Sequence, residues 1–514
     1  MEFCLSFPEW ATMSVITFSF LFLIRNIIGT KNSTPKLPPG PWRLPLIGHM
    51  HHIIGSLPHQ KMRDLAKKHG PVMHLQLGEL TNIIISSPEA AEQVLRTHDI
   101  IFASRPQMSA AKSISYNFKN ITFSPYGDYW RQLRKIATLE LLTAKRVQSF
   151  RSIREEETSK LVELISTTEP GSAINFTRMI TSLTYSITSR AAFGKIWEGE
   201  DVFTASFEKI FGEIGKGITI SDAFPSVKWL QPFDTVDKRC EVLHQQLDEV
   251  VNRILNEHRS ARKGLLVESM DPQKDHLVDV LLNLQEKENL EFPLSDVSIK
   301  AIIMDAFVAG IGTSATIMEW AMSELMKNPK VMEKAQAEVR QKYDTKGRVD
   351  EANLHELSYI KMVIKETFRL HPALPLLVPR ECRERCVIDG YDIPVNSKIM
   401  VNTWAMGRDP KYWGEDADEF KPERFVGSPI DFKGNNNFEF LPFGGGRRSC
   451  PGMLFGLAAI ELPMAKLLFH FDWELDRVKP EDLDMSEEIG VTNKRKSNLQ
   501  IIPTPYLPPI PSTN

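Results

Sequence analysis

The stretch Phe443-Gly444-Gly445-Gly446-Arg447-Arg448-Ser449-Cys450-Pro451-Gly452 places one cysteine after a glycine-rich turn that also carries two arginines. Pro451 and Gly452 keep the backbone from closing as a regular helix at the sulfur. The apolar run from Met453 to Leu468 then predicts a helix, so the thiol is expected near its N-terminal end. The helix dipole and the neighbouring arginines favour thiolate, which is a metal ligand or a nucleophile. Burial as a small hydrophobic residue, the commonest fate of a free cysteine, stays open from the stretch alone.

The spacing of five residues in this stretch matches a known pattern: Phe443, Gly446, Arg448, Cys450 and Gly452. Position by position, it resembles the haem-binding signature of the cytochrome P450 family. The resemblance implies the cytochrome P450 fold, mainly α with a small β subdomain. It also implies haem b (iron protoporphyrin IX) as cofactor, with Cys450 as the axial ligand of the iron. Phe443 and Arg448 are then expected to contact the haem.

The composition is that of a large globular protein. The chain has 514 residues, of which 42% are hydrophobic and 25% charged, and it shows no internal repeat or low-complexity linker. A formal net charge of -3 argues against nucleic acid as a general partner. Five scattered cysteines fit a reducing compartment without a disulfide framework.

The N-terminus differs from the rest of the chain. From Phe3 to Ile28 the only charged residues are Glu9 and Arg25, and basic residues follow this apolar span. The length from Trp10 to Ile28 nearly matches a bilayer core of about 30 Å, and the positive flank predicts a cytosolic body. We therefore expect residues 1–30 to be an uncleaved single-pass anchor, with a cleaved signal peptide as the alternative.

The remaining chain, residues 31–514, is predicted to be one haem-thiolate catalytic domain that begins with a stiff, proline-rich hinge at 35–48. A helix is expected at 57–69, strands at 72–77 and 81–86, a helix from Pro88 to about His98, and a long loop with short helical turns over 105–126. Most of 148–288 reads as helices. Within it, Phe224 to Leu230 is an apolar insertion, interpreted as a surface patch beside a membrane, with core packing as the alternative.

Trp130 and Arg134 lie one helical turn apart, so both can donate to one carboxylate. An ordinary amphipathic helix would show the same spacing. In the cytochrome P450 family, the two residues resemble the pair that holds a haem propionate.

Residues 295–328 predict the longest helix, capped by Ser295 and ended before Pro329. Its middle reads Ala309-Gly310-Ile311-Gly312-Thr313-Ser314, and two glycines inside a helix indicate close approach or a local opening. Small-residue helix packing is the alternative. The resemblance implies that Ala309 and Gly310 lie over the haem face and that Thr313 hydrogen-bonds bound oxygen or its water, which makes these three the expected catalytic residues.

One position departs from the family pattern. The family usually has an acidic residue just before that threonine, where it helps to pass protons, and this chain has Gly312. Water in a polar groove can also carry protons, so oxygen activation is expected to survive.

Glu366 and Arg369 stand one helical turn apart, and with Arg424 they resemble the buried network that supports the haem loop in the family. The role is structural. Downstream, Arg380 resembles a propionate donor. His371 could in principle ligate the iron, but its place matches a family position that binds propionate, and we expect that role.

An axial thiolate favours O–O cleavage, and the electrons must come from elsewhere because the chain carries no dinucleotide-binding glycine motif or flavin domain. The resemblance implies NADPH-cytochrome P450 reductase as the partner. We expect it to dock near Cys450, where basic residues gather, although some of them must face propionates: Arg131, Arg134, Lys135, Arg447 and Arg448.

Residues 36–42 and 102–106 resemble plant microsomal A-type members, and residues 64–78 resemble the terpenoid oxidases among them. This implies an endoplasmic reticulum membrane enzyme that inserts oxygen from O2 into a hydrophobic sesquiterpene or diterpene scaffold. Substrate contacts are expected from four segments: 105–126, 302–316, 374–378 and 489–492. The alternatives are a monooxygenase of another plant secondary metabolite, a haem-thiolate isomerase or dehydratase without external electrons, and a non-enzymatic haem carrier.

Overall fold

The computed structural model describes residues 36–196, 212, 219–229, 236–264, 276–287, 290–434 and 436–506. The predicted anchor at residues 1–30 lies outside the described residues.

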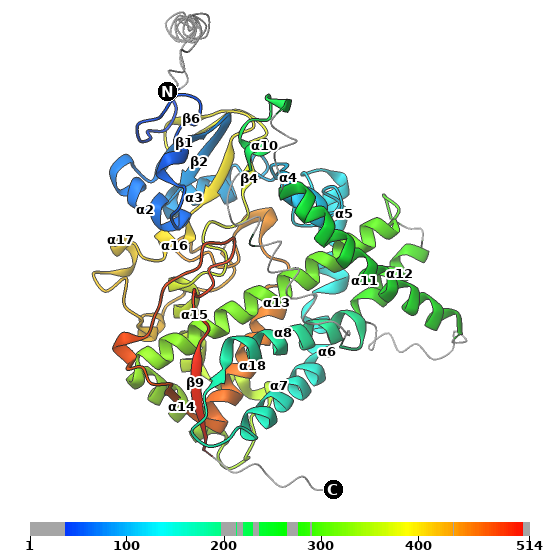
Figure 1. Cartoon of the computed structure of the whole chain (residues 1–514), viewed down its shortest axis with the longest axis vertical. Coiled ribbons are helices and arrows are strands. Elements are labelled where there is room, and N and C mark those ends of the chain that lie inside the picture. The colour runs from blue at the N-terminus through cyan, green and yellow to red at the C-terminus, as the bar shows by residue number, and fades with distance from the viewer. Residues whose placement is uncertain are drawn as a thin grey trace, which may run out of the picture.

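Helices make up most of the described chain (Figure 1). The α-helices are α2 (Pro58–His69), α3 (Pro88–Glu92), α4 (Ser109–Ile114), α5 (Asp128–Ile136), α6 (Ala144–Ser149), α7 (Arg151–Ser166), α8 (Phe176–Phe193), α10 (Ile220–Ala223), α11 (Val236–Gly264), α12 (Leu277–Glu286), α13 (Asp296–Lys327), α14 (Pro329–Tyr343), α15 (Ser358–Leu370), α16 (Thr403–Met406), α17 (Pro410–Trp413) and α18 (Met453–His470). Short 3-10 and π turns complete them: η1 (Met50–His52), η2 (Gln93–Thr97), η3 (Ala137–Leu141), η6 (Glu351–Glu356), η7 (Pro422–Phe425), η8 (Gly446–Arg448) and η9 (Pro480–Asp482).

The strands form small sheets: β1 (Val72–Leu77), β2 (Leu80–Ile85), β3 (Ile174–Asn175), β4 (Arg380–Glu381), β5 (Cys386–Ile388), β6 (Tyr391–Ile393), β7 (Lys398–Val401), β8 (Phe471–Leu475) and β9 (Gln500–Pro505). The largest sheet has the order β1-β2-β7-β4, in which β2 and β7 run parallel and the other pairs antiparallel. Figure 1 shows this sheet at the N-terminal end of the described chain, beside the larger helical part. The prediction of a mainly α protein with a small β subdomain is confirmed.

Helix α13 runs through the middle of the helical part, where it packs against α8, α15 and α18 (Figure 1). The Ser295 hydroxyl accepts a hydrogen bond from the Ser298 N–H at 3.1 Å, and the helix ends at Lys327, just before Pro329. The helix predicted for 295–328 is therefore confirmed, with both of its ends where the capping signals placed them.

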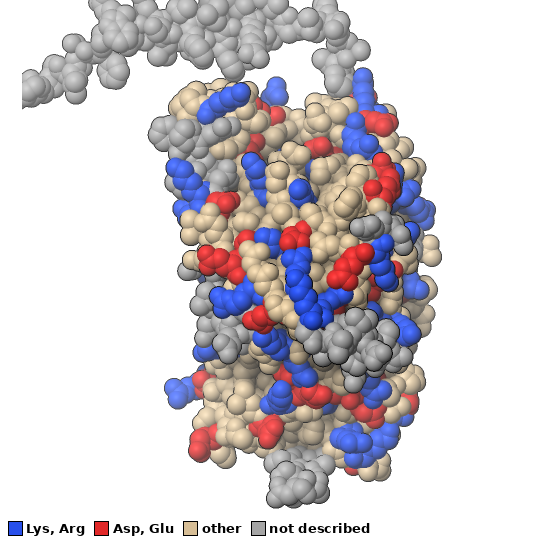
Figure 2. Space-filling view, turned by 90° about the vertical axis from the view of Figure 1, so that its right-hand side faces the viewer, with Lys and Arg blue, Asp and Glu red and all other residues tan. Residues whose placement is uncertain are grey.

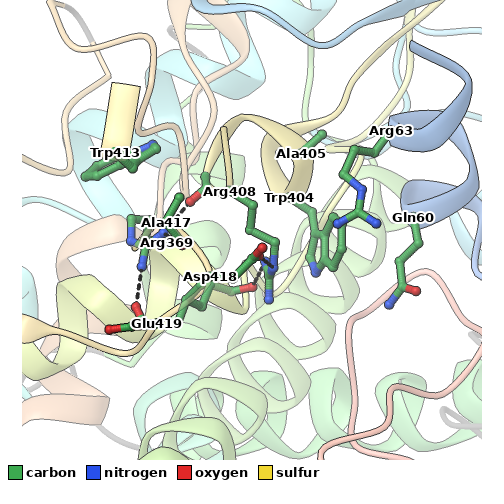
Figure 3. Close-up of polar contacts among 12 residues, drawn as sticks. Gln60, Arg63, Arg369, Trp404, Ala405, Arg408, Trp413, Ala417, Asp418 and Glu419 are labelled. Carbon is green, nitrogen blue, oxygen red and sulfur yellow. Dashed lines mark hydrogen bonds and ion pairs between the residues drawn. The ribbon is translucent and has the colours of Figure 1, made fainter. Parts of the chain in front are cut away.

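A buried ionic network holds α15 to the segment that precedes the cysteine loop. Glu366 is bidentate to Arg369, with both N–O distances 2.7 Å, and Glu366 Oε1 also accepts from Arg424 Nε at 2.8 Å. Arg369 further donates to the Ala417 and Glu419 carbonyls, and Figure 3 shows its guanidinium pointing toward this segment. The predicted structural network is present.

One local structure differs from the sequence prediction. The helix predicted for 88–98 is α-helical only to Glu92 and continues as the π turn η2, in which the His98 N–H donates to the Gln93 carbonyl at 2.8 Å. The short helix α4 lies within the long loop with short helical turns predicted for 105–126, as expected. The π turn brings the Leu95 carbonyl against Gly446, whose hypothetical Cβ would lie 2.2 Å from that oxygen.

Two helices in the described chain, α13 and α18, are long and apolar enough to cross a membrane, and both are mostly buried inside the protein as core helices. On the face shown in Figure 2, acidic and basic side chains are interspersed, in keeping with the small net charge.

Candidate active site

The cysteine loop turns through backbone angles that glycine adopts readily. Gly444 and Gly446 have positive φ angles of 67° and 65°, within the left-handed region that favours glycine. The Cys450 N–H donates to the Phe443 carbonyl at 2.9 Å, which closes the loop. Helix α18 begins three residues later, at Met453, so the sulfur stands before its N-terminus as predicted.

The protonation of Cys450 differs from the sequence prediction. Removal from bulk water raises the pKa of the Cys450 thiol, while a backbone hydrogen bond from Gly452 and the positive charge of Arg134 lower it. In the protein chain alone, desolvation outweighs the helix end and the arginines that were expected to favour thiolate. A metal ion at the sulfur reverses this balance, because a coordinating thiol is deprotonated outright.

Cys450 lines a large cavity of about 950 Å³, and its exposed surface faces this cavity. The volume lies near the upper end of the usual range for small-molecule and cofactor sites. Nine of the ten predicted site residues line it, from separate parts of the chain: Trp130, Arg134, Ala309, Gly310, Thr313, Arg380, Phe443, Arg448 and Cys450.

His371 is the tenth, and the structure places it elsewhere. Its ring stacks on Trp320 with centroids 3.9 Å apart and planes 4° apart, and its Nε2 lies 2.7 Å from Glu324 Oε1. It is not among the residues that line the cavity. The prediction that His371 binds a propionate is corrected: the side chain joins the end of α15 to α13.

On α13, Ala309, Gly310 and Thr313 face the cavity, and the Thr313 hydroxyl donates to the Ala309 carbonyl at 2.6 Å. The two glycines differ. A Cβ on Gly310 would lie 3.1 Å from Thr188 of α8, whereas nothing lies within 4 Å of a Cβ on Gly312. Gly310 therefore permits close helix packing, and Gly312 adds open space.

Four buried or half-buried arginines bring positive charge to the cavity: Arg105, Arg134, Arg380 and Arg448. Arg448 donates to the carbonyls of Ala103, Ile121 and Ser124, and Arg134 donates to the Ser449 carbonyl. Of these four arginines, only Arg380 forms an ion pair with a carboxylate in the described chain, to Asp99 at 3.1 Å. Desolvation and mutual repulsion lower the pKa of Arg448 to about 9 and also lower that of Arg105. An anionic ligand would stabilise this cluster, because a buried charge costs free energy unless an opposite charge pairs with it.

Arg105 was expected only as part of the substrate-contacting segment 105–126, and sequence reasoning missed its place among the cavity arginines. Its Nε donates to the Thr122 carbonyl at 3.0 Å, and its Nη1 donates to the Val378 and Pro379 carbonyls. The sequence offered two signals for Arg105: the Phe102–Pro106 segment, which resembles plant microsomal A-type members, and the 105–126 segment expected to contact substrate.

The rest of the lining is largely apolar. All four segments expected to contact substrate contribute to it. The structure adds residues from η1, α2 and β7 that no motif had indicated, among them Met50, Met62 and Met400.

The comparisons with known proteins agree with this geometry. The sequence model of the Cytochrome P450 family matches residues 38–501. The chain belongs to the cytochrome P450 family.

The chain is 64% identical over 501 residues to Cytochrome P450 71D445 of Euphorbia lathyris, with 97% of each chain covered. It is 50% identical to premnaspirodiene oxygenase of Hyoscyamus muticus, covering 97% of this chain and 99% of the relative. It is 49% identical to 5-epiaristolochene 1,3-dihydroxylase of Nicotiana tabacum, with the same coverage. These relatives bear out the resemblance to plant terpenoid oxidases.

A solved zebrafish cytochrome P450, whose title names progesterone, superposes with a TM-score of 0.74 at 21% identity and covers 87% of this chain and 99% of that one. At this identity the likeness shows the fold. With family membership, the protein is a cytochrome P450 monooxygenase that uses haem and receives electrons from a redox partner.

The cavity fits this cofactor. Haem carries two carboxylates and an iron, and the cavity offers unpaired guanidinium groups, a cysteine sulfur and apolar walls.

Proposed function

We propose that this cytochrome P450 inserts one oxygen atom into a sesquiterpene or diterpene with electrons from NADPH, and that Cys450 holds the iron of haem b. Arg105, Arg134, Arg380, Arg448 and Trp130 would hold the haem carboxylates, and Phe443 would pack beside the haem. The observation that carries this assignment is the convergence of Cys450 and unpaired cavity arginines on one 950 Å³ cavity. When bound, the thiolate-ligated haem supplies an oxidant able to attack an unactivated C–H bond.

The cavity-lining residues of α13 would also serve the reaction. Ala309 and Gly310 leave room beside the haem, since neither has a side chain beyond Cβ. The Thr313 hydroxyl donates a hydrogen bond to the Ala309 carbonyl, and by rotating it could donate the same hydrogen bond to an acceptor in the cavity. Because Gly312 supplies no carboxylate, we expect water beside Thr313 to deliver protons.

The terpenoid substrate is supported by the names of relatives and by the cavity walls. Relatives include premnaspirodiene oxygenase, 5-epiaristolochene 1,3-dihydroxylase and salviol synthase of Salvia pomifera. The lining segments 302–316, 374–378 and 489–492 are largely apolar, and such walls bind an apolar scaffold through its removal from water.

NADPH-cytochrome P450 reductase is the proposed electron donor. Of the five basic residues expected near Cys450, Arg134 and Arg448 turn toward the cavity, while Arg131, Lys135 and Arg447 are exposed. The three exposed side chains are the ones available to a docking partner.

Residues 1–30 are proposed as a single-pass anchor in the endoplasmic reticulum membrane, with the catalytic domain of residues 31–514 on the cytosolic side after the hinge at 35–48. Exposed apolar side chains support contact with a membrane surface, and they include Trp42, Leu46, Ile54 and Trp229. Trp229, in the predicted apolar patch, is 70% exposed, which favours the surface interpretation over core packing. Removal of residues 1–30 should release haem-loaded protein from the membrane fraction; full retention there would overturn the anchor.

The isomerase, dehydratase and haem-carrier alternatives are set aside, because family membership and oxygenase-named relatives establish a monooxygenase. Another plant secondary metabolite stays as the second candidate substrate.

Co-expression with a reductase and a panel of terpene synthases tests the substrate. We expect products heavier by one oxygen atom that require the reductase and vanish in Cys450→Ala. Products from phenolic or fatty acid feeds alone would overturn the terpenoid assignment.

A further inference from the structure

Asp305 places a carboxylate on the cavity face of α13. It stands one helical turn before Ala309 and two turns before Thr313, and all three line the cavity. Among the lining residues of the described chain, the only other carboxylate is Asp222. Gly312 stands where the family usually has an acidic residue. Asp305 could therefore take part in proton delivery, in haem binding, or in both, and its contacts distinguish these roles.

The carboxylate of Asp305 is fully occupied by the loop between α4 and α5. Its Oδ1 accepts from Asn120 Nδ2 at 2.6 Å, and its Oδ2 accepts from the N–H groups of Ile121 and Thr122 at 2.6 and 2.9 Å. Asn120 in turn accepts from the Phe123 N–H at 2.9 Å. The turn over residues 120–123 is thus fastened to α13 through one side chain.

The opposite side of the same peptide groups faces the cavity cations. The peptide between Ile121 and Thr122 gives its N–H to Asp305, and its carbonyl accepts from Trp130 Nε1 and Arg448 Nη1, each at 3.0 Å. The next peptide gives its N–H to Asn120, and its carbonyl accepts from Arg105 Nε at 3.0 Å. Each peptide therefore connects the carboxylate to a cationic or N–H donor, and hydrogen bonds in such chains polarise one another.

The same geometry argues against proton transfer by Asp305. Three donors already occupy its oxygens, and eight residues of helix separate it from Thr313 by about 12 Å. Its negative charge also offsets the positive charge of Arg448.

We propose that Asp305 is a positioning residue for the haem: through the turn over residues 120–123 it fixes Arg105 and Arg448 against the haem carboxylates and holds the indole of Trp130 beside them. This inference rests on the proposed haem-binding roles of those three residues. Asp305 touches neither the haem nor the substrate in this account, and it acts on haem retention and on the charge that the iron experiences.

The first test measures haem transfer from the full-length holoenzyme to an excess of an apo-haem protein acceptor. Asp305→Asn should release haem about 10- to 100-fold faster than the unsubstituted protein, the range seen when outer-shell partners of a metal site are removed. Asp222→Asn, the matched change at the other lining carboxylate, should leave the rate unchanged. Equal rates for Asp305→Asn and the unsubstituted protein would overturn the proposal.

A reduction potential separates positioning from a merely structural role. Loss of the carboxylate leaves the cations less compensated, which favours the reduced iron, so Asp305→Asn should shift the potential to a more positive value. Slower turnover with unchanged haem release and unchanged potential would instead show that Asp305 moves protons, and would overturn the proposal.

A double-mutant cycle identifies the route. Asn120→Ala should also speed haem release, and adding it to Asp305→Asn should change little, because both act through one turn. Arg380→Lys should add independently, since Arg380 is held by Asp99 and the Gly445 carbonyl. If Asp305→Asn does not fold, the rate of haem release from Asn120→Ala tests the proposal instead. A rate equal to that of the unsubstituted protein would then overturn it. If the unsubstituted protein takes up no haem, the proposed function fails as well.

Discussion

Glu319 carries a carboxylate into the buried part of α13. Its oxygen accepts from Thr177 Oγ1 at 2.5 Å and lies 3.9 Å from Arg495 Nε. Burial outweighs these partners and raises the pKa of Glu319 from 4.5 to about 7. The ionised form is therefore the costly one at neutral pH.

Glu319→Gln should remove one component of the pH dependence of stability. Because the folded-state pKa is raised, the folded chain binds the proton more tightly, and stability rises as the pH falls from about 7 toward 4.5. A raise of this size corresponds to about 3 kcal/mol. Thermal unfolding between pH 5 and 8 should show a flatter profile for Glu319→Gln than for the exposed control Glu474→Gln. Identical profiles would contradict the assignment.

At the scale of single residues, the resemblance to the family's motifs indicated nine residues that line the cavity. The cysteine loop and the Thr313 region were indicated because both match sequence motifs of the family. The role predicted for His371 was wrong because its partners, Trp320 and Glu324, lie on another helix, and no local sequence pattern predicts these contacts. Arg105 was missed because an isolated arginine in a loop has no spacing to read.

At the scale of elements, α13 and α8 approach closely at one glycine. A Cβ on Gly310 would meet Thr188 at 3.1 Å, whereas Gly312 has space. The energetic effect of adding a methyl group should therefore differ between two glycines that lie two residues apart in the same helix.

Gly312→Ala should stabilise the protein by up to about 1 kcal/mol, the gain in helix propensity. Gly310→Ala should gain less or lose, because Thr188 must move. Chemical unfolding of the holoprotein measures both, and Thr188→Ala should restore the missing gain to Gly310→Ala alone. Equal stabilities of the two alanine variants would refute the packing argument.

The Glu366 network should be costly to break. Arg369→Leu leaves Glu366 without its bidentate partner at a fully buried position, and removing one member of such a pair costs about 3–5 kcal/mol. The exposed pair of Glu89 and Lys411 serves as control, since Glu89→Gln should cost less than about 1 kcal/mol. Yield of soluble haem-loaded protein and its unfolding midpoint are the measurements. A fully stable Arg369→Leu would show that the network contributes little.

Element boundaries were predictable where caps and prolines mark them, as at Ser295 and Pro329. The π turn over Gln93–Thr97 was not, because its sequence favours an unbroken helix. The extra residue of the π turn occurs where the Leu95 carbonyl approaches Gly446. These two residues are about 350 positions apart, so no local sequence pattern predicts the contact.

At the scale of the whole molecule, electron delivery should depend on an exposed basic surface. Lys135→Glu should slow reduction by the reductase, most strongly at low salt, because exposed charges act mainly on association. Lys330→Glu on α14, which Figure 1 places far from α5, is the matched charge change. Reductase-dependent reduction at several salt concentrations tests this, and equal rates for the two variants would exclude docking at Lys135.

The whole account depends on a bond between the Cys450 sulfur and the haem iron. The most direct measurement is the absorption spectrum of the reduced, carbon monoxide-bound protein, compared with Cys450→Ala. We predict the thiolate-type spectrum for the unsubstituted protein and its loss in Cys450→Ala. An unchanged spectrum in the variant, or no haem in the unsubstituted protein, would contradict the account.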